Sequence, residues 1–219
     1  MRVSVRRVIV GTAARLLEAA PDLLRALAWP SALFIALNIL VTTEAPVWLM
    51  VIANLVSLLL QTIFAVTTHR IIVLGADAVP RWGINSWSTR ETRFTLYALG
   101  LLLAVIIVTS FAVAIGPFGP LLLLPVLLVL GSSLVLVFPA AALDEPISLA
   151  QAWQLAQGNF LPLITVVWLV PTVCALPMVA VLLLGGAMFL LAPLQILVTV
   201  ITVSALSIAY AEIKRAHAT

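Results

Sequence analysis

Six apolar runs, each about as long as a membrane span, constrain the fold more than any other feature of this sequence. A transmembrane helix needs about 20 mainly apolar residues. The runs cover residues 23–43, 46–68, 93–115, 118–140, 160–184 and 187–211. Only 9% of the residues are charged, whereas soluble domains carry about 25%, and a soluble fold could not bury so much apolar surface. We therefore predict an all-α integral membrane protein with six transmembrane helices.

The distribution of positive charge predicts the topology. The 11 Lys and Arg residues fall before or at the start of the first run, between the second and third runs, and after the sixth. Six spans place these three regions on one side of the membrane, and basic loops mark the cytoplasmic side. We predict that both termini are cytoplasmic and that the basic residues face anionic lipid head groups. The basic residues form no long run, so nucleic acid is not an expected partner.

Two shorter segments predict helices that lie along the cytoplasmic surface of the membrane. Residues 3–20 alternate apolar and charged positions at helical spacing, and Pro21 is expected to bend the chain into the first span. Residues 149–157 follow a capping-box sequence that starts at Ser148, and Gly158 is a suitable stop. Both segments are typical of interfacial amphipathic helices.

Uncharged polar residues repeat at helical spacing inside the spans. They are Asn38 in the first run, Asn54, Ser57, Gln61 and Thr68 in the second, and Gln195, Thr199 and Thr202 in the sixth. Polar side chains are costly in hydrocarbon, so these stripes are expected to face protein or water. Two interpretations stay open. The stripes either hold helices together, as polar residues often do in membranes, or line a polar cavity between the second and sixth spans.

A second group of candidate residues lies where these two spans reach the cytoplasm. His69 and Arg70 end the second span, and Tyr210 and Glu212 end the sixth. One hypothesis is a cluster in which Arg70 pairs with Glu212 near His69. The alternative is that the arginine extends toward the membrane surface and the tyrosine sits at the interface.

The sequence has few residues that could carry enzyme chemistry. It contains two histidines and one cysteine, too few for a structural zinc site. It has no Gly-rich phosphate loop followed by Lys and no nucleophile elbow. We predict no catalytic residues, no metal and no cofactor. Prolines in the fifth run, at Pro162, Pro171 and Pro177, leave two interpretations open. The helix is either broken or mobile there, or an ordinary span, since proline is commoner in membrane helices than in soluble ones.

One stretch resembles a known group of proteins. The segment LDEPISLAQAWQLAQGNF, residues 143–160, and the sequence Ser207-Ile-Ala-Tyr210 resemble a loose group of bacterial six-span inner-membrane proteins. That group includes proteins similar to the membrane domain attached to some glycerophosphodiester phosphodiesterases. The resemblance covers about 25 residues and implies a bacterial inner-membrane location. It supplies no catalytic residue, because the shared motif describes a helix, a loop and a span.

Two functions remain open from the sequence. The first is a non-enzymatic scaffold or accessory subunit of a membrane complex, with a membrane-protein partner or a second copy of the chain. The short outer loops and the absence of catalytic motifs favour it. The second is a small transporter, channel or lipid-handling protein, favoured by the polar stripes and the proline-rich span. The lack of a charge deep in any span argues against ion-coupled transport.

Overall fold

The computed structural model describes residues 3–40, 45–80, 87–145, 147–185 and 188–218. Within these ranges the chain is helical and has no strand. The helices are α1 (Val5–Leu40), α2 (Val47–Leu74), α3 (Thr89–Ile115), α4 (Gly119–Leu134), α5 (Val137–Ala142), α6 (Leu149–Ala156), α7 (Phe160–Ile164), α8 (Val170–Leu183) and α9 (Leu191–Ala218), with short 3-10 turns η1 (Ala76–Ala78) and η3 (Met188–Leu190). Six helical segments in the described ranges are long and apolar enough to cross a membrane, which confirms the predicted all-α class and the number of candidate spans.

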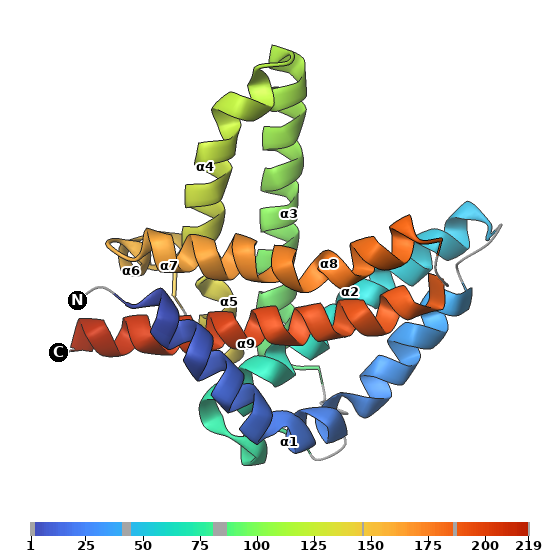
Figure 1. The fold of residues 1–219 in the computed structure, drawn as a ribbon, viewed down its shortest axis with the longest axis horizontal. Coiled ribbons are helices and arrows are strands. Elements are labelled where there is room, and N and C mark those ends of the chain that lie inside the picture. Colours follow the sequence, from blue (N-terminus) through green and yellow to red (C-terminus); the bar gives the residue numbers. More distant parts are fainter. Residues whose placement is uncertain (1–2, 41–44, 81–86, 146, 186–187, 219) are drawn as a thin grey trace.

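Figure 1 shows two parts that diverge. Helices α3 and α4 run side by side and stand away from the rest of the molecule; we call them the hairpin. Helices α1, α2 and α9 contact one another, α8 packs on α9, and these four helices form the body. The hairpin contacts the body through its base only, where α5, α6 and α7 connect the two parts.

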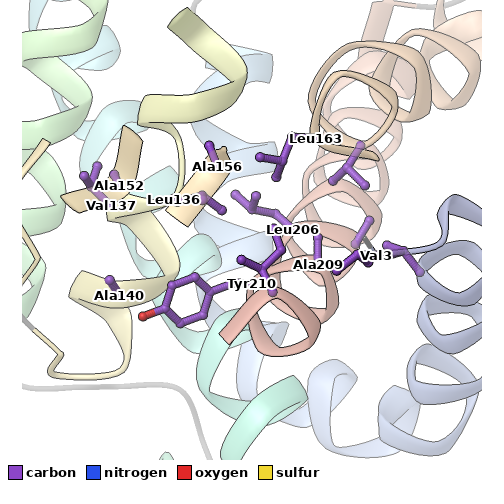
Figure 2. Packing of buried hydrophobic residues seen from close by; sticks show 14 residues of the cluster. Val3, Leu136, Val137, Ala140, Ala152, Ala156, Leu163, Leu206, Ala209 and Tyr210 are labelled. Carbon is purple, nitrogen blue, oxygen red and sulfur yellow. The ribbon is translucent and has the colours of Figure 1, made fainter. Parts of the chain in front are cut away.

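The main apolar core lies at this junction. Figure 2 shows side chains from α5, α6, α7 and α9 that meet there, among them Leu136, Ala156, Leu163 and Leu206. Many of the buried residues are alanines, which allow the helix backbones to approach closely. The core therefore holds the base of the hairpin against α9 at the end of the body that carries most of the charged residues.

The turn between α3 and α4 depends on two glycines. Helix α3 ends at Gly116, whose φ of 93° lies in the region that favours glycine. Helix α4 starts at Gly119, where an added Cβ atom would lie 1.8 Å from the Ala112 carbonyl oxygen. Because that distance is far below van der Waals contact, only glycine fits this close approach of the two helices.

The first helix differs from the prediction. Residues 3–20 do not form a separate surface helix, because α1 is continuous from Val5 to Leu40 and contains both Pro21 and Pro30. A proline inside a helix removes one backbone hydrogen bond and can bend the helix without ending it. Figure 1 shows that α1 bends along its length. A bend at Pro21 is what the sequence predicts, whereas a separate helix before it is not formed.

The short helix α6 begins where its sequence predicts. The Ser148 hydroxyl accepts a hydrogen bond from the Gln151 backbone N–H at 3.2 Å. The Gln151 side-chain oxygen accepts one from the Ser148 backbone N–H at 2.7 Å, which completes a capping box. Gly158, just after the helix, has a φ of 78°. That α6 lies along a membrane surface stays a prediction.

The fifth candidate span is a continuous helical segment, Phe160–Leu183, with one irregular turn beside its prolines. It consists of α7, a π-helical turn η2 (Thr165–Leu169) and α8. The Val170 backbone N–H donates to the Thr165 carbonyl, five residues earlier. Pro171 follows at once and has no N–H to donate, so the wider turn fits a local change in the hydrogen-bond pattern. Trp168 in this turn donates to the Ser132 hydroxyl of α4 at 3.0 Å, which ties the body to the hairpin.

Candidate functional site: a polar cavity and a charged joint

A cavity of about 260 Å³ lies where the hairpin leaves the body; we call it the polar cavity. It is lined from α2 by Leu58, Gln61, Thr62, Ala65 and His69, from α3 by Phe94 and Ala98, from the α4–α5 region by Val135 and Phe138, and from α9 by Thr199, Thr202, Val203 and Leu206. Steps of three and four residues place each group on one helix face. The wall is mainly apolar with a few polar groups, as is common in ligand sites.

Three residues of the predicted stripes meet in this cavity. Gln61 of α2 lies there with Thr199 and Thr202 of α9. The Thr199 hydroxyl donates to the Gln195 carbonyl at 2.9 Å, whereas the Gln61 amide has no hydrogen bond to another described residue. The amide therefore keeps its full capacity for a ligand or for water.

The other stripe residues lie elsewhere. Asn38 and Asn54 each donate to a carbonyl of their own helix, at Phe34 and Met50. Asn54 is exposed, so it faces away from the body. Ser57 and Gln195 are half-buried outside the cavity, and Thr68 is buried behind it. The polar residues of α2 therefore do not share one environment. Gln61 lines the cavity and Asn54 is exposed, because α2 packs against different neighbours along its length.

His69 is the most unusual member of the cavity wall, and the sequence placed it in a different cluster. It is 1% exposed, and its Nδ1 lies 2.7 Å from the Ser207 hydroxyl oxygen on α9. Ser207 donates its only proton to the Val203 carbonyl at 2.8 Å. Its oxygen must therefore accept the proton on Nδ1 of His69, which leaves Nε2 of a neutral ring as an acceptor.

Four buried polar atoms around this site have no hydrogen-bond partner among the described residues. They are His69 Nε2 and the hydroxyl oxygens of Thr67, Thr68 and Thr202. Buried polar groups are nearly always paired, and each exception calls for an explanation. Two of the four residues, His69 and Thr202, also line the cavity. Each of these atoms exposes less than 1 Å² of surface, so a bound molecule would pair with them after a shift of the neighbouring side chains.

The hairpin and the body are joined by charges at the base of the cavity. The Asp144 carboxylate lies 3.0 Å from Arg70 of α2 and 3.0 Å from Arg90 of α3. Asp144 has a φ of 60°, a conformation that Asp and Asn tolerate better than most residues. Arg90 also contacts the buried Glu91 at 3.1 Å. One loop residue therefore links both parts of the molecule.

The adjacent Glu145 holds α9 to the same loop. The Tyr210 hydroxyl donates to Glu145 at 2.8 Å, and Lys214 forms an ion pair with it. We call Asp144, Glu145 and their partners Arg70, Arg90, Tyr210 and Lys214 the charged joint. One sequence signal could have indicated the charged joint, because Asp144 and Glu145 lie in a loop predicted on the basic side of the membrane.

The predicted cluster of His69, Arg70, Tyr210 and Glu212 is not present as one unit. Arg70 pairs with Asp144, because the loop between α5 and α6 lies between the ends of α2 and α9. Glu212 instead contacts Arg7 of α1 at 3.6 Å and Arg215 of its own helix at 2.7 Å. The pairing of Arg70 with Glu212 is therefore wrong, although both residues lie in ion pairs.

No known protein identifies this site. No family model matches the chain, and comparisons with curated proteins and with solved structures give no match. Among the described residues, no group of three or more His, Cys, Asp or Glu side chains is placed to hold a metal. The resemblance of residues 143–160 to bacterial six-span proteins stays a prediction.

Proposed function

We propose that this protein binds the polar part of an uncharged amphiphile in the polar cavity and acts in the transport or handling of that lipid-like molecule. The single observation that carries this proposal is the cavity itself. It combines unpaired polar atoms of His69 and Thr202 and the free Gln61 amide with a mainly apolar wall. Polar groups without partners are costly inside a membrane protein, so a site that retains them is suited to a ligand.

The cavity argues for an uncharged ligand group. No Asp, Glu, Lys or Arg lines it. A charge placed there would have no counter-charge in surroundings of low dielectric constant, which costs several kcal/mol or more. Hydroxyl and amide groups match the acceptor at His69 Nε2 and the donor and acceptor of Gln61.

The volume argues for part of a larger molecule. About 260 Å³ is smaller than the roughly 300–1,000 Å³ of pockets that enclose a drug-sized ligand. The cavity lies where α3 diverges from α9, beside the apolar surfaces of the hairpin and the body. A polar head group can enter it while an apolar tail remains among the lipids.

Native mass spectrometry of the protein released from its own membranes in mild detergent tests the binding. We expect a specific adduct of an uncharged amphiphile that is retained by the wild type and lost in Gln61→Leu. Asn54→Leu is the matched control, because Asn54 lies on the same helix but is exposed. Equal retention in wild type and Gln61→Leu, or no adduct in either, contradicts the proposed site.

A flux assay tests the transport part. Vesicles that contain the protein and glucosyl diacylglycerol with an NBD-labelled acyl chain are treated with dithionite, which quenches the outer leaflet. We expect faster movement of the label between leaflets with wild type and Asn54→Leu than with Gln61→Leu. If the adduct is present but movement is unchanged, the protein binds the lipid without transporting it.

A scaffold or accessory subunit, without catalytic activity, is a second candidate function. The hairpin favours it, because α3 has only Glu91, Phe94 and Ala112 buried and offers the rest of its surface to a membrane partner. The same mass spectra discriminate between the two functions. A stoichiometric protein adduct, either a partner or a second copy of the chain, supports the scaffold, and loss of that adduct should not depend on Gln61.

We further propose that the protein resides in a bacterial inner membrane with the charged joint and both termini in the cytoplasm. The positive charge near the ends of α1, α2, α3 and α9 supports this orientation. A cysteine introduced at His217, after removal of the only native cysteine by Cys174→Ala, tests it. It should react with a membrane-impermeant maleimide only after the cells are opened.

A further inference from the structure

A long apolar groove runs along α9 on the side away from the polar cavity. One hollow of about 680 Å³ lies between α1 and the first half of α9. A second of about 450 Å³ lies between α1, the η2–α8 region and the second half of α9. Both are lined by Leu16 and Ile201, so they adjoin. We call them together the α1/α9 groove.

The wall of this groove suits hydrocarbon. Its residues are almost all Leu, Ile, Val or Ala. The hydroxyl groups of Thr12 and Thr165 donate to carbonyls of their own helices, at Val8 and Leu161. These hydroxyls have no proton left to donate to a ligand. Only Ser31, at the far end of the groove, has a hydroxyl with no hydrogen bond to another described residue. The groove therefore differs from the polar cavity, which has several such polar groups.

Positive charge lies at the end of the groove near the start of α1. Arg6 precedes Ile9 and Ala13 by three and seven residues, so it continues the helix face that lines the groove. Arg6 is exposed and forms no ion pair with another described residue. Helix α1 begins at Val5 and has no acidic residue in its first turn, so its N-terminal dipole adds to the positive field.

The acidic residue nearest to this end is already paired. Glu212 contacts Arg7 of α1 and Arg215 of α9. Two arginines therefore compensate its charge, and Arg6 is left to attract an anion. The distance along α1 also fits a lipid. Helix α1 lines the groove from Val8 to Ser31, a rise of about 35 Å, so the groove is long enough for an acyl chain that spans half of the roughly 30 Å hydrocarbon core.

We propose that the α1/α9 groove is a binding site for an anionic phospholipid, with its acyl chain in the groove and its phosphate at Arg6. This site is separate from the polar cavity and does not depend on the function proposed for it. Charge complementarity at Arg6 distinguishes it from nonspecific contact with membrane lipid, which has no preference for head-group charge. Bound lipid should seal α1 against α8 and α9.

The test uses native mass spectrometry of the full chain reconstituted with equal amounts of phosphatidylglycerol and phosphatidylcholine that carry the same acyl chains. We expect the wild type to retain phosphatidylglycerol at least severalfold over phosphatidylcholine, and Arg6→Gln to retain both equally. Arg93→Gln is the matched control. It removes the same charge from an exposed arginine of α3 that forms no ion pair with another described residue.

A second variant tests the groove itself. Ala13→Trp places a large side chain in the groove wall and should reduce retention of both lipids, whereas Leu102→Trp on the exposed surface of α3 should not. Equal retention of the two lipids by the wild type, or an unchanged preference in Arg6→Gln, overturns the proposal. Unchanged retention in a folded Ala13→Trp protein also overturns it, and Arg6→Gln keeps the test decisive if Ala13→Trp does not fold.

Discussion

Helix α2 of the body and helix α3 of the hairpin differ in how much they depend on neighbouring helices, whereas α8 at the edge of the body resembles α3 and has no buried residue. Helix α2 of the body has eleven buried residues, whereas α3 of the hairpin has three. Yet both helices are long and apolar enough to cross a membrane. Both helices are therefore apolar enough to cross a membrane, although α2 is packed against other helices over much of its length and α3 is not.

The difference follows from their polar residues. In α3, the hydroxyls of Thr109 and Ser110 donate to carbonyls of the same helix. This outer part of α3 needs no protein partner, because lipid solvates the remaining apolar surface. Nearer the base of the hairpin, the hydroxyl of Thr95 lies 3.1 Å from that of Thr62 on α2. In the body, His69 needs Ser207 from another helix. Polar side chains, more than hydrophobicity, thus decide which membrane helices pack together.

The largest expected effect is at the turn that closes the hairpin. Gly119→Ala should lower the free energy of unfolding by about 3 kcal/mol, because the new Cβ would overlap the Ala112 carbonyl oxygen and force the two helices apart. The measurement is unfolding by SDS in mixed micelles. Gly100→Ala is the control, since no atom lies within 4 Å of the Cβ added there.

If Gly119→Ala and Gly100→Ala have the same stability, the contact between α3 and α4 contributes little to the fold. The hairpin would then be two independent spans, and its contrast with the body would become sharper. If only Gly119→Ala unfolds more easily, the hairpin is a unit with its own tertiary structure.

A smaller effect is expected at the joint between the two parts. Asp144→Asn removes the charge that links Arg70 and Arg90, and it should lower the free energy of unfolding by about 1 kcal/mol, the upper part of the range for exposed ion pairs. Asn is chosen because it tolerates the positive φ of this position. Unfolding is compared at low and high salt, and the loss should shrink as salt screens the pairs.

Asp77→Asn is the control for this charge change, because Asp77 is exposed and forms no ion pair with another described residue. A salt-independent loss in Asp144→Asn would mean that the loop acts through its hydrogen bonds. The charged joint would then not be what holds the hairpin to the body.

Features set by residues close together in the sequence could be predicted. Features that depend on contacts between distant segments could not. Local signals were sufficient for the six candidate spans and for the start of α6 at Ser148. The prediction of a separate helix over residues 3–20 is wrong, because α1 continues through Pro21 to Leu40. Whether a proline bends or ends a helix depends on what the following residues contact. Hydropathy also placed the start of the third span at residue 93, whereas α3 begins at Thr89.

The candidate site was harder to predict, because its residues come from distant parts of the chain. Spacing along α2 and α9 was enough to select Gln61, Thr199 and Thr202. It could not show that Asp144, rather than Glu212, reaches Arg70, because that depends on how the α5–α6 loop folds back. His69 was noticed, but its contact with Ser207 joins residues 138 positions apart.

The smallest expected effect tests whether the body retains polar groups for a ligand. Thr202→Val removes a buried hydroxyl that has no partner among the described residues while keeping the branched shape, so it should raise the free energy of unfolding by up to about 1 kcal/mol. Thr199→Val, whose hydroxyl is already bonded to Gln195, should give no gain. SDS unfolding of ligand-free protein measures both.

A gain in stability in Thr202→Val alone, together with weaker retention of the amphiphile, means that the body retains a destabilising polar group for binding, whereas the hairpin does not. A loss of stability instead means that the hydroxyl is satisfied without a ligand, and the body would then differ from the hairpin in packing alone.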